Sequence, residues 1–375
     1  MSKKLFTKFF VFLLVVGLLF AVAPTMQAQA ATVTVNPGES IQAAIDAAAI
    51  GDVIEVASGT YYGAITINKE VTLRSIAGPA TTIIHGGLTV NDTMYVLVIR
   101  SSNVTLDGFT VTSPNYNPAA PYNTGDPMGI GVGYYGDNSL SNITVTNNWV
   151  TQIGSPDRLV NADCYPSVGI VVNGVVNGLN LTNNKVFDIH QTVTDPAVTW
   201  GPTGIGFYGY DTTPLSSNVV ISGNEVYNIS ANADAPDTTI SNGIRAGWGS
   251  GDVTIEKNIV HDIDGRAIAV TSSNNGVATI TENAISNADT GIYLGNAGGG
   301  VLSGNTFTNV AVQVDQLPVH NINMGKWYAT IQDAVTASAA GDVIEVIPGT
   351  YEVNSQITIN KAITLRGQPG AKLQV

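Results

Sequence analysis

An asparagine recurs at the same place in six successive repeats, and this feature restricts the fold more than any other. Around it, each repeat has two short runs in which apolar and polar residues alternate, as in ITVTNNWVTQI (143–153) and LNLTNNKVFDI (179–189). Strands of four or five residues cannot bury an apolar side alone, so the repeats must stack coil on coil. The recurring asparagines are Asn148, Asn184, Asn224, Asn258, Asn283 and Asn305.

A second marker, a small residue followed by isoleucine, gives each coil a third short strand. The alternating Val and Ile side chains would then form one continuous core, with each strand paired in parallel to its copies in the neighbouring coils. Asparagine tolerates left-handed turns and can bond to the asparagine of the next coil, so we expect an asparagine ladder along the axis. The markers are Gly129-Ile130, Gly169-Ile170, Gly204-Ile205, Gly243-Ile244, Ala267-Ile268 and Gly291-Ile292.

This pattern of asparagine turns between short strands resembles the pectate-lyase-like right-handed β-helix superfamily, over residues 33–315 and again over 326–375. The resemblance implies an all-β fold, a right-handed single-stranded parallel β-helix (a solenoid) with three parallel sheets. It leaves the reaction open, because the superfamily includes lyases, hydrolases, esterases, epimerases and noncatalytic adhesins. The Asp-Asp pair and Gly-His-Gly of the polygalacturonase branch are absent, as are the Gln-Ala-Val and Asp-Phe-Ile-Phe-Gly segments of pectin methylesterases.

Residues 39–49, ESIQAAIDAAA, place apolar residues on one face of a short helix. In related β-helices such a helix covers the open N-terminal end of the core, which would otherwise expose strand edges. The same unit returns 290 residues later, where residues 331–351 repeat the pattern of 41–61. We therefore expect a second β-helix that starts at about residue 326 and is truncated at residue 375. The alternative is that this unit folds back as a C-terminal cap.

The first thirty residues are typical of a secretory signal peptide. Lys3, Lys4 and Lys8 precede an apolar run over residues 5–23, and Ala28-Gln29-Ala30 fits the cleavage pattern. A retained membrane anchor is the alternative, because the apolar run is nearly long enough to span a bilayer. Cleavage would give a secreted or cell-surface chain with no membrane span. It would leave 12 of the 15 basic residues against 28 acidic ones, a net charge of −16, which disfavours binding to nucleic acid.

Long insertions occur at one corner of successive coils, just before the Gly-Ile strand. Insertions at one corner stack along one edge of a solenoid, and that face is often the binding face. The alternative is that their aromatic residues only pack the loops onto the barrel. The long segments are 114–127, 153–169, 189–204 and 229–243, whereas the same turn is minimal at 263–267 and 288–291.

The residues of this corner predict a lateral groove for a polysaccharide or a surface glycan. Aromatic rings stack on sugar rings, and carboxylates or arginine bond hydroxyl groups or a uronate. Arg245 is expected to be the only cation at the outward positions of the Gly-Ile strands. The expected catalytic residues are Asp163, Asp195 and Arg245, and the expected substrate-binding residues are Tyr134, Tyr135, Trp200, Tyr208 and Trp248.

Two functions stay open at this point. The first is a secreted polysaccharide lyase or glycoside hydrolase, for which Ca²⁺ bound by loop aspartates is the one cofactor considered. The second is a noncatalytic monomeric protein of the cell surface that binds glycans or serves as a rigid spacer. Asp188 and Asp262 occupy one column of the repeat, so we expect turn-ladder residues rather than catalytic acids. His190, at the mouth of an insertion, stays open as a general base.

Overall fold

The computed structural model describes residues 30–86, 95–113, 128–134, 139–153, 159–160, 166–193, 200–208, 215–232, 235, 240–247, 250–271, 277–294, 300–352 and 356–374. The proposed signal peptide and much of the long insertions lie outside these residues, so the predictions about them stay predictions. Among the described residues, no helix is long and apolar enough to cross a membrane.

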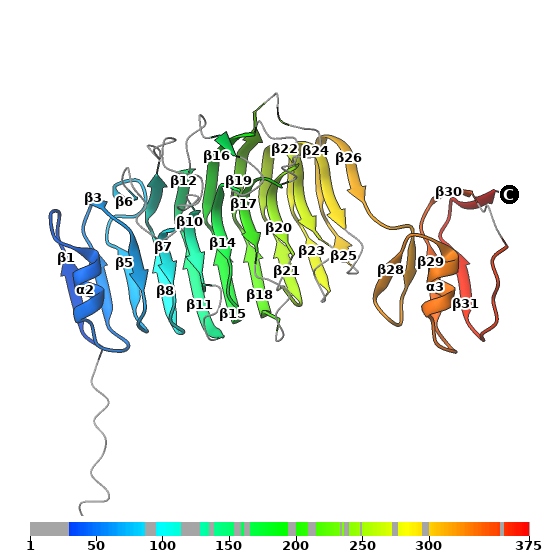
Figure 1. The fold of residues 1–375 in the computed structure, drawn as a ribbon, viewed down its shortest axis with the longest axis horizontal. Coiled ribbons are helices and arrows are strands. Elements are labelled where there is room, and N and C mark those ends of the chain that lie inside the picture. The colour runs from blue at the N-terminus through cyan, green and yellow to red at the C-terminus, as the bar shows by residue number, and fades with distance from the viewer. Residues whose placement is uncertain are drawn as a thin grey trace, which may run out of the picture.

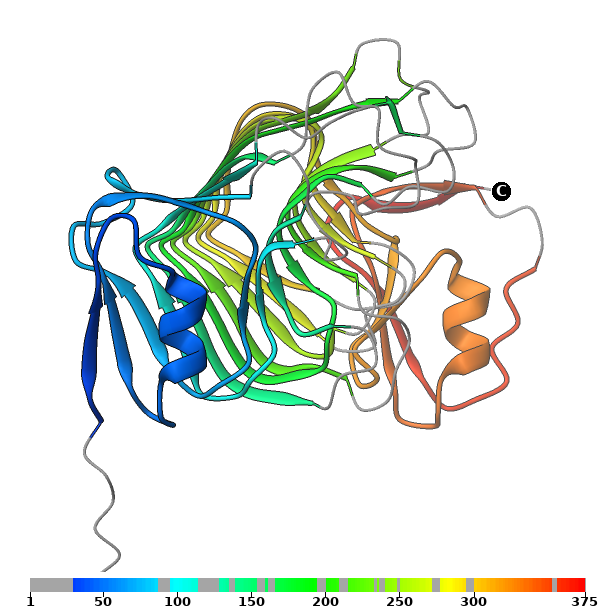
Figure 2. The same ribbon diagram turned by 60° about the vertical axis from the view of Figure 1, so that its left-hand side comes forward.

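Residues 32–315 wind into stacked coils of parallel strands (Figure 1). Figure 2, turned toward the axis, shows successive coils following nearly the same outline. This arrangement confirms the predicted all-β parallel β-helix. One wall is a 10-stranded sheet of β1 (Thr32–Val35), β2 (Val53–Val56), β5 (Thr72–Ser75), β8 (Val104–Asp107), β11 (Leu140–Thr146), β15 (Val176–Thr182), β18 (Ser217–Ser222), β21 (Val253–Glu256), β23 (Ala278–Thr281) and β25 (Gly300–Ser303).

The other two walls are joined into a single 16-stranded sheet, so the three predicted walls of parallel strands form two hydrogen-bonded sheets. In the last coils the corner is tight enough for β22 (Ile259–Val270), β24 (Ala284–Leu294) and β26 (Thr306–Asp315) to run through both walls. The wall that follows the asparagines, here the asparagine wall, contains β3 (Gly59–Tyr62), β6 (Thr82–His85), β9 (Thr110–Ser113), β12 (Trp149–Ile153), β16 (Lys185–Val193), β19 (Glu225–Ala231) and the first halves of β22, β24 and β26.

The third wall, here the Gly-Ile wall, carries the Gly-Ile markers on its strands. The short strand β13 (Leu159–Val160) pairs with β16 of the asparagine wall and belongs to neither row of stacked strands. The Gly-Ile wall contains β4 (Ile65–Ile67), β7 (Tyr95–Ile99), β10 (Met128–Val132), β14 (Val168–Val172), β17 (Trp200–Phe207), β20 (Ile240–Ala246) and the second halves of β22, β24 and β26.

The predicted asparagine ladder is present inside the turns. The Asn258 Oδ1 atom accepts hydrogen bonds of 2.9 Å from both the backbone N and the Nδ2 of Asn224. The same pair of contacts joins Asn224 to Asn184 and continues through Asn283 to Asn305. Since Asn184, Asn224 and Asn258 are at most 1% exposed, the ladder satisfies backbone N–H groups that water cannot reach.

The repeated glycines have a packing role that the sequence pattern did not reveal. A Cβ atom on Gly204 would lie 2.5 Å from a methyl of Val226 on the asparagine wall and 2.6 Å from the carbonyl oxygen of Gly243. Gly243 is confined in the same way by Val260 and Ala267. The two walls therefore converge at this column, and a side chain is excluded from it in these coils.

A second ladder runs along the outside of the asparagine wall. Asp188 and Asp262 both adopt a left-handed backbone with φ of 55°. The Nδ2 atoms of Asn228 and Asn287 donate to their carboxylates, over 2.5 Å and 2.7 Å. The prediction that Asp188 and Asp262 are turn-ladder residues is confirmed.

Helix α2 (Ile41–Ala47) lies across the N-terminal end of the coils, as Figure 2 shows. Its N-cap Ser40 accepts from the backbone N of Ala43, and Ile41 and Ile45 enter the core. The predicted capping helix is therefore present.

Residues 319–374 form a smaller unit with a hydrophobic cluster of its own, beside the end of the coils in Figure 1. Helix α3 (Ile331–Ala337) stands where α2 stands in the first unit. The first strand of this unit is arranged differently from that of the first unit. Strand β27 (Val319–Asn321) is antiparallel to both β28 (Lys326–Tyr328) and β29 (Val343–Val346). Beyond them, β29 pairs with β31 (Thr364–Gly367), and β30 (Gly349–Glu352) pairs with β32 (Ala371–Gln374), both in parallel.

Candidate functional site

The outward face of the Gly-Ile wall brings residues of successive coils into straight columns. Because Ile205, Ile244 and Ile268 point into the core, the next residue of each strand points outward. One outward column consists of Val98, Gly131, Val171, Gly206, Arg245, Ala269, Tyr293 and Asp315. A second consists of Met128, Val168, Thr203, Asn242, Arg266 and Thr290.

The N-terminal half of this face is apolar and covered. Tyr95, Val98 and Val171 are at most 3% exposed and form a cluster with Met128 and Val168, against which Tyr134 and Tyr208 pack. The rings of Tyr95 and Tyr134 meet edge to face with centroids 6.1 Å apart. This half therefore serves packing rather than ligand contact.

The C-terminal half carries two arginines, each above a tyrosine ring, which we call the arginine–tyrosine face. The Arg245 Cζ atom lies 4.7 Å from the Tyr208 ring centroid, and its Nη1 donates to the carbonyl oxygen of Phe207 over 3.1 Å. The Arg266 Cζ atom lies 3.5 Å from the Tyr293 ring centroid. Cation–π contacts of this kind hold guanidinium groups in place.

The two guanidinium groups also interact electrostatically. Burial lowers the pKa of Arg266, the charges of Tyr293 and Asp315 raise it, and nearby Arg245 lowers it. An anion between the two arginines would relieve this repulsion. The expectation that Arg245 is the only outward cation is wrong. Arg266 was missed because sequence reasoning considered only the residue after each isoleucine, and Arg266 lies two residues before Ile268.

The structure places four of the predicted site residues and brings two of them together, Arg245 and Tyr208. Tyr134 lies instead against Tyr95, with the Arg100 Cζ atom 5.3 Å from its ring centroid. Trp200 is half-buried at the start of β17, where its carbonyl oxygen accepts from the Nε2 of Gln191. The remaining predicted residues, which are Asp163, Asp195, Tyr135 and Trp248, lie outside the described residues.

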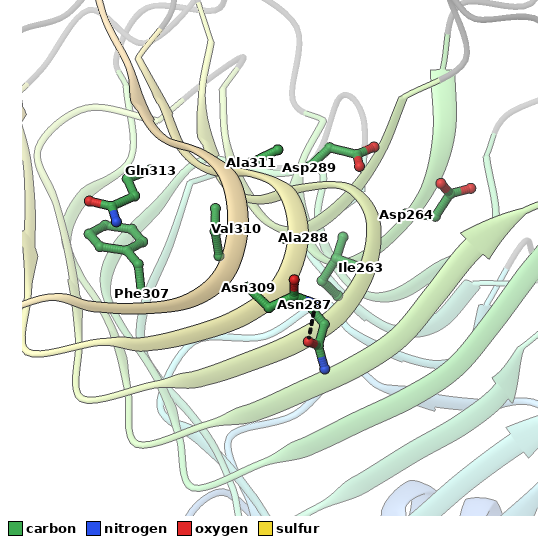
Figure 3. A pocket seen from close by; sticks show the side chains of 10 residues that line it. All are labelled: Ile263, Asp264, Asn287, Ala288, Asp289, Phe307, Asn309, Val310, Ala311 and Gln313. Carbon is green, nitrogen blue, oxygen red and sulfur yellow. Dashed lines mark hydrogen bonds between the residues drawn. The ribbon is translucent and has the colours of Figure 1, made fainter.

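A cleft of about 530 Å³ opens at the corner where the insertions are minimal (Figure 3). Asp264 and Asp289 project from neighbouring coils on the same side of the chain. Burial and then the charge of Asp289 raise the pKa of Asp264, so one carboxyl of the pair holds its proton more strongly. Ile263, Ala288 and Val310 also line the cleft.

No group of three or more His, Cys, Asp or Glu side chains suited to a metal occurs within the described ranges. Asp264 and Asp289 provide two carboxylates, fewer than a protein-built Ca²⁺ site normally uses.

Comparison with known proteins finds low sequence identity. An alginate lyase from Paenibacillus sp. is 14% identical, with 76% of this chain and 99% of that chain covered and a TM-score of 0.42. The enzymatically active domain of tailspike protein 2 from bacteriophage CBA120 is 15% identical, with 72% and 40% covered and a TM-score of 0.42. A carrot pectin methylesterase is 11% identical, with 78% and 89% covered and a TM-score of 0.34. No curated protein sequence matches significantly.

The family model "Right handed beta helix region" matches residues 237–361, which span the last coils and most of the second unit. The identities to solved structures are too low to transfer a residue's role. The parallel coils and the asparagine ladder identify the fold as a right-handed parallel β-helix, and the family match over the last coils and the second unit agrees with that fold.

Proposed function

We propose that this is a secreted or cell-surface carbohydrate-active protein that binds an acidic polysaccharide on its arginine–tyrosine face. The observation that carries the proposal is the pair of arginines, Arg245 and Arg266, each held on a tyrosine ring. The full chain has a net charge of −13, so a cationic face is unlike the rest of the molecule. Such a face favours an anionic ligand over a neutral one.

The chemistry of the face suits a sugar acid. A planar guanidinium binds a carboxylate through two parallel N–H donors, and the apolar side of a pyranose packs against an aromatic ring. Adjacent coils of a parallel sheet are about 4.8 Å apart, so columns of side chains along the axis can contact successive sugar units. The long axis of the polysaccharide would then follow the axis of the β-helix.

Cleavage of the bound chain, by hydrolysis or by elimination, is the finer part of the proposal. For hydrolysis, Asp264 and Asp289 would supply the two carboxyl groups that the reaction needs. Asp163 and Asp195 remain proposed as further catalytic residues. A noncatalytic glycan-binding protein would use the same arginines without turnover.

Isothermal titration calorimetry with oligomers of different uronic acids tests the binding. Arg266→Ala and Arg245→Ala are each expected to weaken binding by about 10-fold or more, since a charge-assisted hydrogen bond contributes roughly 1.5–3 kcal/mol. Arg74→Ala is the matched control, because Arg74 pairs with Glu55 on the opposite sheet. Reducing ends and absorbance of unsaturated uronates, measured with and without Ca²⁺, distinguish hydrolysis, elimination and no cleavage.

Equal affinity of the wild type and both variants for a bound uronate oligomer would place the binding site elsewhere. Failure of every acidic oligomer to bind would contradict the proposal and favour a spacer.

A further inference from the structure

A histidine and a serine form a hydrogen-bonded pair on the outside of the asparagine wall. His190 on β16 is directly opposite Ser230 on β19 in the parallel register. The His190 Nδ1 atom lies 2.8 Å from the Ser230 Oγ atom. A nucleophile and its base need this spacing, about 2.6–3.2 Å.

The pair is accessible and held on a rigid support. Ile189 and Ile229, the preceding residues, are fully buried, so His190 and Ser230 point outward, and both are half-buried. The next residue, Gln191, is anchored to the Gly-Ile wall by its side chain, which accepts from the backbone N of Ser167 and donates to the carbonyl oxygen of Trp200. These two bonds hold the strand in place directly after His190.

The cleft of Figure 3 begins one coil beyond the serine. Ile229 pairs with Ile263 and Ile263 with Ala288, so Asp264 and Asp289 follow in the next two coils at the place that Ser230 has in its own coil, directly after the paired residue. Asp264 and Asp289 line that cleft.

We propose that Ser230 and His190 are the nucleophile and base of an esterase that removes O-acyl groups from a bound glycan. The glycan part rests on the proposed function, whereas the ester chemistry does not depend on it. The sequence indicates His190 alone, because Ser230 lies 40 residues away and meets His190 only when the coils stack.

The reaction proceeds in two balanced steps. The Ser230 Oγ atom attacks the acyl carbonyl carbon, its proton passes to the His190 Nδ1 atom, and the bond to the sugar oxygen breaks as that oxygen takes the proton. Water then attacks the acyl-serine ester, with its proton accepted by His190 and returned to the Ser230 oxygen. The products are the deacylated sugar and a carboxylic acid.

The test uses the whole chain, a fluorophosphonate probe and p-nitrophenyl acetate. Peptide mapping should find the probe on Ser230, and Ser230→Ala should lose both labelling and turnover. His190→Asn should lower kcat/KM by about 100-fold to 10,000-fold, the usual contribution of a general base. Ser286→Ala and His261→Asn, on the same wall, are the matched controls and should retain full activity.

Labelling elsewhere, or full turnover by folded Ser230→Ala, would overturn the esterase proposal. Release of acetate from an acetylated polyuronate extends the test to glycan. If p-nitrophenyl acetate is hydrolysed through Ser230 but no uronate oligomer binds, the esterase stands and the proposed glycan fails. If uronate binds without any Ser230-dependent hydrolysis, only the esterase fails.

Discussion

Replacement of Asn258 by leucine tests whether the buried ladder holds the coils together. The Asn258 side chain accepts from the backbone N and the Nδ2 of Asn224 and donates to the carbonyl oxygen of Ile221 and the Oδ1 of Asn283. Leucine removes all four bonds. The Asn224 Nδ2 keeps another acceptor in Leu181, but the Asn224 backbone N–H loses its partner in a site that is 0% exposed.

The expected loss of stability is about 3 kcal/mol, since an orphaned buried donor costs roughly 1–3 kcal/mol and each further lost bond about 1 kcal/mol or less. Urea unfolding followed by circular dichroism measures the total. Native-state hydrogen exchange at the Asn224 amide measures the local part, which should be the largest increase in exchange.

Asn305→Leu is the matched control, because Asn305 ends the ladder, is half-buried and has only one asparagine neighbour. It should cost clearly less than Asn258→Leu. Equal losses of stability for the two variants, or a loss below about 0.5 kcal/mol for Asn258→Leu, would refute the explanation that the ladder stabilises the fold because it is buried.

Two further predictions follow from the packing. Gly204→Ala should destabilise the protein by about 1–3 kcal/mol, the usual cost of overpacking, because the alanine methyl would meet Val226 and the Gly243 carbonyl. An unchanged midpoint of urea unfolding would show that the two walls can separate freely. Deletion of residues 316–375 should shift the melting temperature of the first unit by less than about 2 °C, because the two units have separate sheets and cores. A shift of many degrees would show that the second unit is a cap.

The sequence predicted the features that depend on one column of the repeat. The asparagine ladder and the outer ladder at Asp188 and Asp262 follow from side chains that bond to their own copies in adjacent coils. The need for glycine at 204 and 243 depends instead on how closely the two walls approach each other. The pattern of residues at one position of the repeat does not show that distance.

The site was predicted less completely than the fold. Arg266 and Ser230 were overlooked because the first lies two residues before its isoleucine and the second gains meaning only beside His190. The described cleft lies at the minimal corners, beside Asp264 and Asp289, whereas most residues of the long insertions lie outside the described part of the chain.

The reversed strand β27 has a consequence for how such units combine. In stacked parallel coils, each strand pairs with the same strand of the coil before it. A strand added at the end of a solenoid would therefore take its direction and register from the last coil. The hairpin of β27 and β28 interrupts this parallel register. Strand β29 pairs instead with β27, in the antiparallel direction. Units joined in this way would melt as separate transitions in a calorimeter, and exchange of one unit for another would leave the winding of its neighbour undisturbed.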